Sequence, residues 1–383
     1  MTKVDRSYAV DLFRGLAIVA MILVNNPGSW SHLYAPLAHA EWHGWTPTDL
    51  IFPFFLIIIG VAIQLSFGMG SKSVMARPDQ LKEIFIRSLK LYGLGLFLTL
   101  FYYQFHNPDY SWINDRLFEV RLVGVLQRIA FVYCFSALIF LYLSQKQQII
   151  AFVGLLVGYW IAMMWIPYPL PDGTTTMGQL EPGNNMAAFI DHHVIGPAHV
   201  YLSSTKPFAS DPEGLLSTLP AIASCVGGFY IASLLQKPVR ERIRVLILTG
   251  MAALVVAYVL ATWIPFNKPL WTPSYVFLAH GLASLVLAAA TYVTEIKNIR
   301  LGTRAFVVFG MNAIALFMLS GIFARILLMM RKGDQSLKGW IYQFFELVPV
   351  SAETQSLLYA VVFLIFMYIP LYWMYQKRIF WKV

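Results

Sequence analysis

The sequence has little charge and almost no cysteine. Only 12% of its 383 residues are charged, whereas 58% are hydrophobic. A soluble globule of this size needs more polar surface, so the composition argues against that class and predicts a polytopic membrane protein. Its two cysteines, Cys134 and Cys225, both fall within apolar stretches. They give no disulfide framework and no metal-ligand spacing.

Several catalytic signatures are also missing. The eight histidines form no HExxH arrangement, and no glycine-rich phosphate loop or GxSxG turn is present. These absences argue against metal-dependent hydrolysis and against a serine-hydrolase mechanism, and they predict no metal site. The net charge of +9 requires no nucleic-acid partner, because Lys and Arg gather in alternate loops, as membrane topology demands.

Long apolar runs recur along the whole chain. A membrane-spanning helix needs about 20 mainly apolar residues. The sequence therefore predicts an all-α bundle in the lipid bilayer, with about ten transmembrane helices. The predicted spans are 8–26, 47–68, 84–103, 121–143, 149–167, 214–235, 243–264, 273–293, 304–329 and 356–375.

The positive charges predict the orientation of these spans. Loops rich in Lys and Arg are expected in the cytoplasm, which places both chain termini inside. The long loop at about 168–213 has only one Lys and is predicted to be extracytoplasmic. The whole chain, 1–383, is interpreted as a single transmembrane domain, and its first span as an uncleaved one.

The first span carries polar residues on one helical stripe. Asp11, Arg14 and Asn25 share this face, and charged groups inside a membrane are functional candidates by default. One interpretation is that Asp11 pairs locally with Arg14 while Asn25 and Asn26 cap the helix end. The other is a buried polar channel that links a cationic cytoplasmic mouth to a site near the outer face.

A loop with two histidines follows this span. His39 is a candidate general base or transient nucleophile, because imidazole exchanges protons near neutral pH. Thr46, Pro47 and Asp49 resemble a capping box at the start of the next helix, which explains Asp49 structurally. Asp49 is also a candidate to orient His39 through the ring nitrogen that the chemistry does not use.

Later spans contain polar groups of their own. The fourth span is predicted to place Arg121, Gly124 and Arg128 on one helix face. Residues 211–214 (DPEG) and 271–274 (WTPS) are predicted to open the sixth and eighth helices. Asn312 lies in a ninth span with small residues of the kind used for close helix packing.

These runs, in order along nearly the whole chain, resemble the heparan-α-glucosaminide N-acetyltransferase family of transmembrane acetyltransferases. The matching segments are 11–15 (DLFRG), 24–28 (VNNPG), 39–44 (HAEWHG), 49–55 (DLIFPFF), 124–128 (GVLQR), 211–214 (DPEG), 271–275 (WTPSY) and 310–313 (GMNA). The closest likeness is to bacterial members associated with N-acetylglucosamine metabolism. One departure affects substrate choice: His43 stands where the family usually has Asn.

The resemblance implies acetyl transfer from cytoplasmic acetyl-CoA to an amino sugar on the other side of a bacterial inner membrane, and it implies a homodimer. It assigns catalysis to His39, Asn25 and Asp49. The candidate residues for acetyl-CoA are Arg14, Arg87, Gln127, Arg128 and Asn312. The candidate residues for the sugar are Asn26, Trp42, His43, Glu213, Trp271 and Ser274.

Whether His39 acts as a base or carries the acetyl group stays open at this point. Two alternatives to an enzyme also stay open: an amino-sugar or N-acetylglucosamine transporter, and a membrane protein that binds the sugar without catalysis. The sequence offers no second copy of the His39 loop, although many transporters contain internal repeats.

Overall fold

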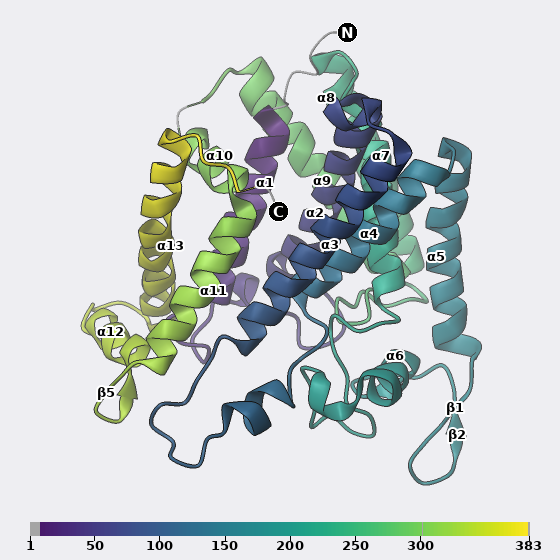
Figure 1. The fold of residues 1–383 in the computed structure, drawn as a ribbon. Helices are drawn as coiled ribbons and strands as arrows, with labels where there is room; N and C mark the ends of the chain where they lie inside the picture. Colours follow the sequence, from purple (N-terminus) through teal and green to yellow (C-terminus); the bar gives the residue numbers. More distant parts are fainter. Residues whose placement is uncertain (1–7, 301, 382–383) are drawn as a thin grey trace.

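The computed structural model describes residues 8–300 and 302–381, and in this part the chain is a bundle of long helices (Figure 1). The two chain ends that the topology prediction places in the cytoplasm, 1–7 and 382–383, lie outside the described residues. The long helices are α1 (Tyr8–Asn25), α2 (Ile51–Ile63), α3 (Arg77–Leu100), α4 (Val125–Tyr142), α5 (Gln145–Trp165), α7 (Thr218–Leu234), α8 (Val239–Leu260), α9 (Pro273–Thr291), α11 (Ala313–Met329) and α13 (Ala352–Gln376).

Shorter elements extend or connect these helices. Turns of 3₁₀ or π helix are η1 (Ala35–Leu37), η2 (Pro47–Leu50), η3 (Gln64–Met69), η4 (Ser71–Val74), η5 (Ile113–Leu117), η6 (Asp191–Ile195), η7 (Pro197–His199) and η8 (Tyr292–Ile296). The short α-helices are α6 (Met186–Ile190), α10 (Thr303–Met311) and α12 (Leu337–Glu346). Three antiparallel pairs of two-residue strands complete the fold: β1 (Tyr168–Pro169) with β2 (Thr175–Thr176), β3 (Leu180–Glu181) with β4 (Asn184–Asn185), and β5 (Arg331–Lys332) with β6 (Gln335–Ser336).

The long helices alternate in direction, so their connections gather at two ends of the bundle. One end carries the strand pairs, α6, α12 and the loops 26–46, 101–124, 166–217 and 261–272 (lower edge of Figure 1), and is called the loop end below. The N-terminus of α1 lies at the opposite end. This alternation agrees with the predicted order of spans, while the side of the membrane that each end faces stays a prediction.

Every predicted span contains a helix. Within the described residues, seven helices are long and apolar enough to cross a membrane, and the bent pair α10–α11 makes an eighth. Helix α3 carries several charged residues in its first turns, and α7 has only 17 residues. The all-α polytopic class is therefore confirmed, and the number of ten spans stays a prediction.

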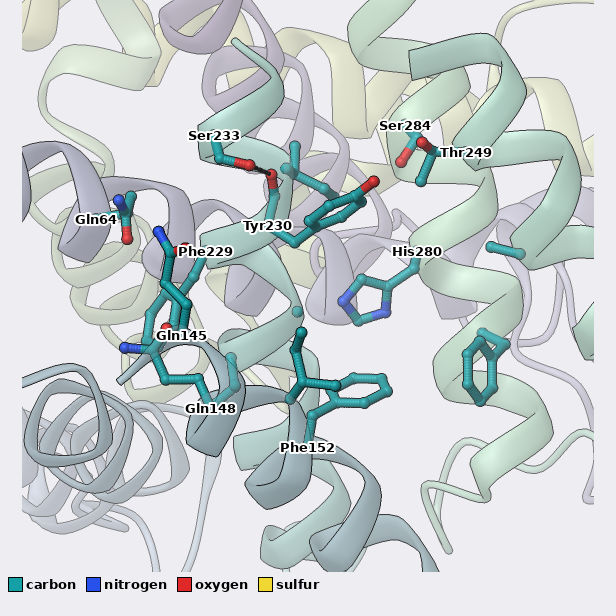
Figure 2. A pocket seen from close by; sticks show the side chains of 16 residues that line it. Gln64, Gln145, Gln148, Phe152, Phe229, Tyr230, Ser233, Thr249, His280 and Ser284 are labelled. Carbon is teal, nitrogen blue, oxygen red and sulfur yellow. Dashed lines mark hydrogen bonds between the residues drawn. The ribbon is translucent and has the colours of Figure 1, made fainter. Parts of the chain in front are cut away.

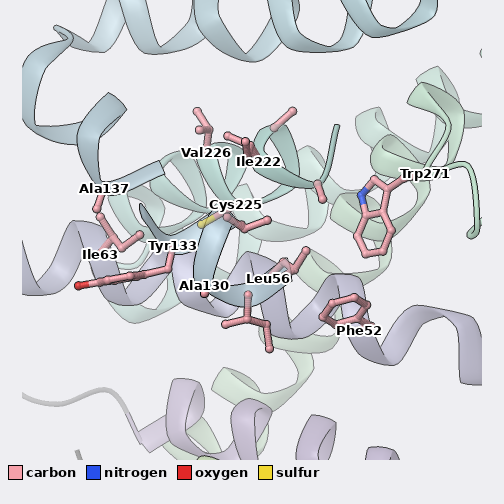
Figure 3. Packing of buried hydrophobic residues seen from close by; sticks show 14 of the residues in the cluster. Phe52, Leu56, Ile63, Ala130, Tyr133, Ala137, Ile222, Cys225, Val226 and Trp271 are labelled. Atoms are coloured by element: carbon pink, nitrogen blue, oxygen red, sulfur yellow. The ribbon is translucent and has the colours of Figure 1, made fainter. Parts of the chain in front are cut away.

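The centre of the bundle is formed by α2, α4 and α7 (Figure 3). Leu56 of α2, Ala137 of α4 and Cys225 of α7 are completely buried in one hydrophobic cluster. A Cβ atom at Gly60 of α2 would lie 1.8 Å from the carbonyl oxygen of Cys225, so only glycine lets the two backbones approach this closely. This packing fixes the last turn of α2 relative to α7.

Helix α1 packs against α10 in the same manner. A Cβ atom at Gly15 would lie 1.9 Å from the carbonyl oxygen of Phe306, and one at Gly310 would lie 2.7 Å from the carbonyl oxygen of Asp11. Ile18 and Met21, which share the polar stripe of α1, are buried in a hydrophobic cluster. The stripe is therefore filled by packed side chains, which does not support the interpretation of a polar channel along it.

Three local predictions are wrong. Helix α4 begins at Val125, so Arg121 lies in the preceding loop and does not share a helix face with Arg128. Helix α7 begins at Thr218, so residues 211–214 form a turn instead of opening the helix. The predicted span 304–329 is broken by a bend of 82° between α10 and α11, at Asn312.

Candidate functional site

The His39 imidazole and the Asp49 carboxylate meet at the loop end. His39 Nδ1 lies 2.6 Å from Asp49 Oδ1. The side chain of Asp49 is only 3% exposed, whereas that of His39 is 51% exposed. A buried carboxylate thus holds one edge of a ring whose other edge faces solvent.

Asp49 is fixed by the helix start, as its position in the predicted capping box requires. Its Oδ2 atom accepts hydrogen bonds from the backbone N–H of Ala40 at 3.1 Å and of Thr46 at 3.0 Å. Thr46 is the N-cap of η2, Pro47 occupies the first turn, and the capping box is complete. Tyr275 of α9 donates to the backbone carbonyl of Asp49 at 2.5 Å. Asp49 therefore caps the helix and orients His39 at the same time.

This geometry determines the tautomer of His39. A carboxylate oxygen only accepts hydrogen bonds, so a contact of 2.6 Å requires the proton to sit on Nδ1. The lone pair of the neutral ring is then on Nε2, at the exposed edge. A neutral imidazole with a free Nε2 is the form that accepts a proton or attacks a carbonyl carbon.

Lys268 completes this cluster, although no motif or spacing in the sequence marks it. It lies in the turn between α8 and α9, and its Nζ atom is 3.2 Å from His39 Nδ1 and 3.5 Å from Asp49 Oδ1. Burial lowers the pKa of Lys268, and the carboxylates of Asp49 and Glu213 partly offset this effect. Lys268 therefore connects the His39–Asp49 pair to a second group of charges.

That second group is built around Arg121. Arg121 donates to both carboxylate oxygens of Asp211, from Nε at 2.7 Å and from Nη2 at 2.5 Å, and also to Glu213 at 2.5 Å. The Asp211 side chain is fully buried. Burial raises the pKa of Glu213, but the charges of Arg121, Arg128 and Lys268 outweigh burial and hold that pKa below its ordinary value. Both carboxylates are thus held as acceptors by Arg121.

Arg128 lies beneath this group and is 1% exposed. Its Nη2 atom donates to the carbonyl of Gly214 at 3.0 Å and to the Ser217 hydroxyl. Among the described residues, its Nε and Nη1 atoms have no hydrogen-bond partner. The guanidinium lies 5.3 Å from the ring of Trp271. Because a buried guanidinium without hydrogen-bond partners is costly, Arg128 remains a candidate to bind a ligand.

Trp271 and Ser274 belong to the turn that carries Lys268. Trp271 is 1% exposed and has a backbone φ of +54°, a conformation that side-chain-bearing residues rarely adopt. Its indole N–H donates to the Ser224 hydroxyl at 2.9 Å. Ser274 donates to the carbonyl of Pro265 at 3.1 Å and closes the turn. Both residues shape the turn, and their predicted contact with a sugar stays a prediction.

Trp42 and His43 are fixed by contacts outside their own loop. The indole N–H of Trp42 donates to the carbonyl of Leu180 at 2.8 Å. Asn267 Nδ2 lies 3.0 Å from the carbonyl oxygen of Trp42 and 3.3 Å from His43 Nδ1. The His39 loop is thereby tied to the β3–β4 hairpin and to the Lys268 turn.

The polar residues of α1 lie at its two ends. Near the start of α1, Arg14 Nη1 is 3.7 Å from Asp11 Oδ1, which confirms the predicted local pair. At the other end, Asn26 Nδ2 donates to the carbonyl of Ile22 at 2.8 Å and caps the helix. Asn25 is exposed at the loop end. Its predicted role beside His39 stays a prediction.

Three further candidates for acetyl-CoA lie elsewhere in the bundle. The Arg87 guanidinium lies 4.5 Å from the ring of Tyr133, between α3 and α4. Gln127 is 2% exposed and packs against Gly95 of α3. Asn312, at the break between α10 and α11, donates to the carbonyl of Ile379 at 3.0 Å and accepts from Trp381 N at 2.9 Å. The amide of Asn312 therefore holds the C-terminal segment.

A cavity of about 570 Å³ lies away from these residues (Figure 2). Its walls come from α5, α7, α8 and α9 and are mostly apolar, with Gln64, Gln145 and Gln148 at one side and His280 at the other. His280 Nδ1 lies 2.8 Å from the carbonyl oxygen of Val276. An apolar wall of this kind suits a sugar poorly. No group of three or more metal-ligating side chains occurs in residues 8–300 and 302–381.

The fold and this site define a multi-pass helical membrane protein with an oriented His–Asp pair at one end of its bundle. The family model described as "Heparan-alpha-glucosaminide N-acetyltransferase, catalytic" matches residues 6–181, somewhat less than half of the chain. This match includes His39, Asp49 and Arg128, whereas Glu213 and Lys268 lie beyond it.

Two curated proteins align with the whole length of the chain. The heparan-alpha-glucosaminide N-acetyltransferase of Mus musculus is 26% identical over 100% of this chain and 61% of its own length. The protein of the same name from Homo sapiens is 26% identical over 99% of this chain and 60% of its own length. The chain spans about three fifths of the length of these relatives. The chain is thus similar to the heparan-α-glucosaminide N-acetyltransferases over its whole length, as its motifs predict.

Proposed function

We propose that this protein is a transmembrane acetyltransferase that moves the acetyl group of acetyl-CoA to the amine of a glucosamine-type sugar. The observation that carries the proposal is the His39–Asp49 pair, with Nδ1 held at 2.6 Å and Nε2 at the exposed edge. The names of the two curated relatives support N-acetyl transfer to a glucosaminide as the reaction class. The matching family model spans the segment that contains the pair.

The pair supports two routes for the same reaction. In one route, Nε2 of His39 removes a proton from the sugar amine while the amine nitrogen attacks the thioester carbonyl carbon. The C–S bond breaks, the amide bond forms, and the CoA thiolate takes up a proton. In the other route, Nε2 attacks the thioester carbonyl carbon first, the C–S bond breaks and CoA leaves as the thiolate. The sugar amine then displaces the imidazole from the acetyl group, and the proton that the amine loses is taken up by the freed Nε2 and passes to the thiolate.

In both routes Asp49 stabilises the positive charge that develops on the ring. It does so without moving, because its second oxygen is anchored by Ala40 and Thr46. A preorganised carboxylate of this kind lowers the barrier because no dipole has to turn during the reaction. The sugar amine is expected to approach from the solvent side, where the flanking Trp42 and His43 and the nearby Glu213 are candidate contacts.

The two substrates are proposed to arrive from opposite sides of a bacterial inner membrane. Acetyl-CoA is anionic, and Arg14 lies near the end of α1 that the charge distribution assigns to the cytoplasm. His39 lies at the loop end, which is the predicted extracytoplasmic end. Transfer between these ends would move the acetyl group across the membrane without transport of CoA. It would follow a route other than the stripe of α1, because Ile18 and Met21 fill that stripe.

Purified protein in sealed liposomes tests this proposal. Acetyl-CoA is supplied outside, glucosamine is enclosed inside, and the contents are analysed by mass spectrometry. The proposal expects N-acetylglucosamine to form only when both substrates and the protein are present. In a second arrangement, glucosamine or N-acetylglucosamine is supplied outside. If the sugar enters the liposomes unmodified and neither arrangement gives acetylation, the protein is a permease and the proposal is overturned.

A further inference from the structure

Lys268 approaches the His39–Asp49 pair from a distant part of the chain. Its ammonium nitrogen is 3.2 Å from His39 Nδ1 and 3.5 Å from Asp49 Oδ1. Because Asp49 already requires the proton on Nδ1, that nitrogen has no lone pair to accept a hydrogen bond from Lys268. The action of Lys268 on the ring is therefore electrostatic, and it comes from a positive charge placed against a neutral imidazole.

The turn that carries Lys268 is rigid and joined to the His39 loop. Asn267 is fully buried, its Oδ1 accepts from Leu270 N at 2.8 Å, and its backbone N–H donates to Thr272 at 3.1 Å. The backbone of Gly44 donates to the carbonyl of Phe266 at 2.8 Å. The two loops therefore form one unit, which holds the ammonium in place.

The charges around the ring act in opposite directions. The carboxylate of Asp49 favours a second proton on His39, and the ammonium of Lys268 disfavours it. The other ionisable groups of the same loop, His32, Tyr34, Glu41 and His43, are exposed to water. On its far side, Lys268 is attracted by Glu213, which helps to keep the ammonium charged.

We propose that Lys268 is a positioning residue of the acetyl-transfer site, which keeps His39 in its neutral Nδ1–H form so that Nε2 stays available. Asp49 selects the tautomer, and Lys268 opposes formation of the imidazolium. The proposal rests on the proposed function for its catalytic meaning, but the protonation of His39 is measurable without any reaction.

The first experiment measures the pH dependence of acetyl transfer in Lys268→Met and Lys268→Arg. Removal of the charge is expected to move the acid-side midpoint of the profile upward by about one pH unit, as loss of a neighbouring like charge should. Lys268→Arg keeps a cation and should stay near the midpoint of the unchanged protein. Lys332→Met is the matched control, because Lys332 is also at the loop end but stacks on Trp340.

The second experiment labels His39 with diethyl pyrocarbonate, which modifies only unprotonated imidazole, and quantifies the labelled peptide across pH. The labelling midpoint of Lys268→Met should also rise by about one unit, with Lys268→Arg and Lys332→Met unchanged. Equal midpoints in Lys268→Met and the unchanged protein would overturn the proposal, as would equal shifts in Lys268→Met and Lys268→Arg.

The two experiments separate two kinds of failure. If the unchanged protein transfers no acetyl group but its labelling midpoint responds to Lys268, the proposed function fails and the electrostatic role stands. If transfer occurs and neither midpoint responds, the role of Lys268 fails and the proposed function stands.

Discussion

Two ionic clusters lie at the loop end, and they use their polar atoms differently. In the cluster of Arg121, Asp211 and Glu213, the guanidinium and both carboxylates are engaged with one another. In the cluster of His39, Asp49 and Lys268, the ring keeps one nitrogen at an exposed edge. The comparison teaches that the first cluster holds two loops together, while the second leaves a reactive atom available.

The largest expected effect on stability comes from breaking the cluster of Arg121, Asp211 and Glu213, which is called the closed cluster below. Asp211→Ala leaves the guanidinium of Arg121 without its bidentate partner, which should lower the free energy of unfolding by about 3–5 kcal/mol. Unfolding of purified protein in a denaturing detergent measures this loss. Glu213→Gln is the control, because it leaves the contact between Arg121 and Asp211 intact and should cost less. If Asp211→Ala were as stable as His39→Ala, the contrast between the clusters would be lost.

A pH effect of similar size is expected at Asp191, which lies under the closed cluster and is 1% exposed. Burial raises the pKa of Asp191 to about 7, against the hydrogen bonds from Leu215 N and Asp211 N. Between its ordinary pKa and about 7, the folded state retains a proton that the unfolded state has lost. Stability should therefore fall as pH rises through this window, by at most roughly 4 kcal/mol.

Asp191→Asn cannot ionise, so it should remove this pH dependence of stability. Thermal unfolding of both proteins at a series of pH values measures the difference. Parallel curves for Asp191→Asn and the unchanged protein would show that Asp191 is already ionised in the folded state.

A smaller loss of stability is expected from a substitution at the contact between α2 and α7. Gly60→Ala places a methyl group against the carbonyl of Cys225, and overpacking of this kind costs about 1–3 kcal/mol. Gly158→Ala in α5 is the matched control, because a Cβ atom there meets nothing within 4 Å. Thermal stability should fall only for Gly60→Ala. Because η2, which carries Asp49, leads directly into α2, activity should fall as well, and an equal effect of the two substitutions would argue against this close packing.

The smallest effect on stability is expected for Asp49→Asn. Asparagine still accepts the capping hydrogen bonds, so the free energy of unfolding should change by about 1 kcal/mol. Activity should fall, because a neutral amide no longer stabilises positive charge on His39, but less than in His39→Ala. Unfolding and acetyl transfer measured on the same preparation test both parts. Unchanged activity in Asp49→Asn would show that the charge of Asp49 takes no part in catalysis.

Local patterns predicted much of this fold and part of the site. Apolar runs locate the helices, and the capping signals of Thr46 and Pro47 bring Asp49 to the helix start, within reach of His39. The structure adds what depends on distant contacts. Arg121 meets Asp211 across 90 residues, and Lys268 meets His39 across 229. No period or spacing marks such pairs, since they arise only when loops from separate helices meet at one end.

The failures have the same physical origin. The apolar run beside Arg121 predicts a helix at that residue, yet its carboxylate partners hold it in the loop before α4. Hydropathy does not register a bend, so residues 304–329 are predicted as one span although the helix bends by 82° at Asn312. The amide of Asn312 pairs with the C-terminal segment at that bend.

Acetyl transfer by His39→Ala is the sharpest test of whether His39 is the catalytic base or acetyl carrier. The unchanged protein and the variant are purified in the same detergent, and kcat/KM for acetyl-CoA and glucosamine is measured for both. Loss of a positioned general base should lower the rate by about 10²–10⁴-fold, whereas the free energy of unfolding should fall by only about 1 kcal/mol, because Lys268 still faces the buried Asp49 carboxylate. Full activity in a folded His39→Ala protein would contradict the account.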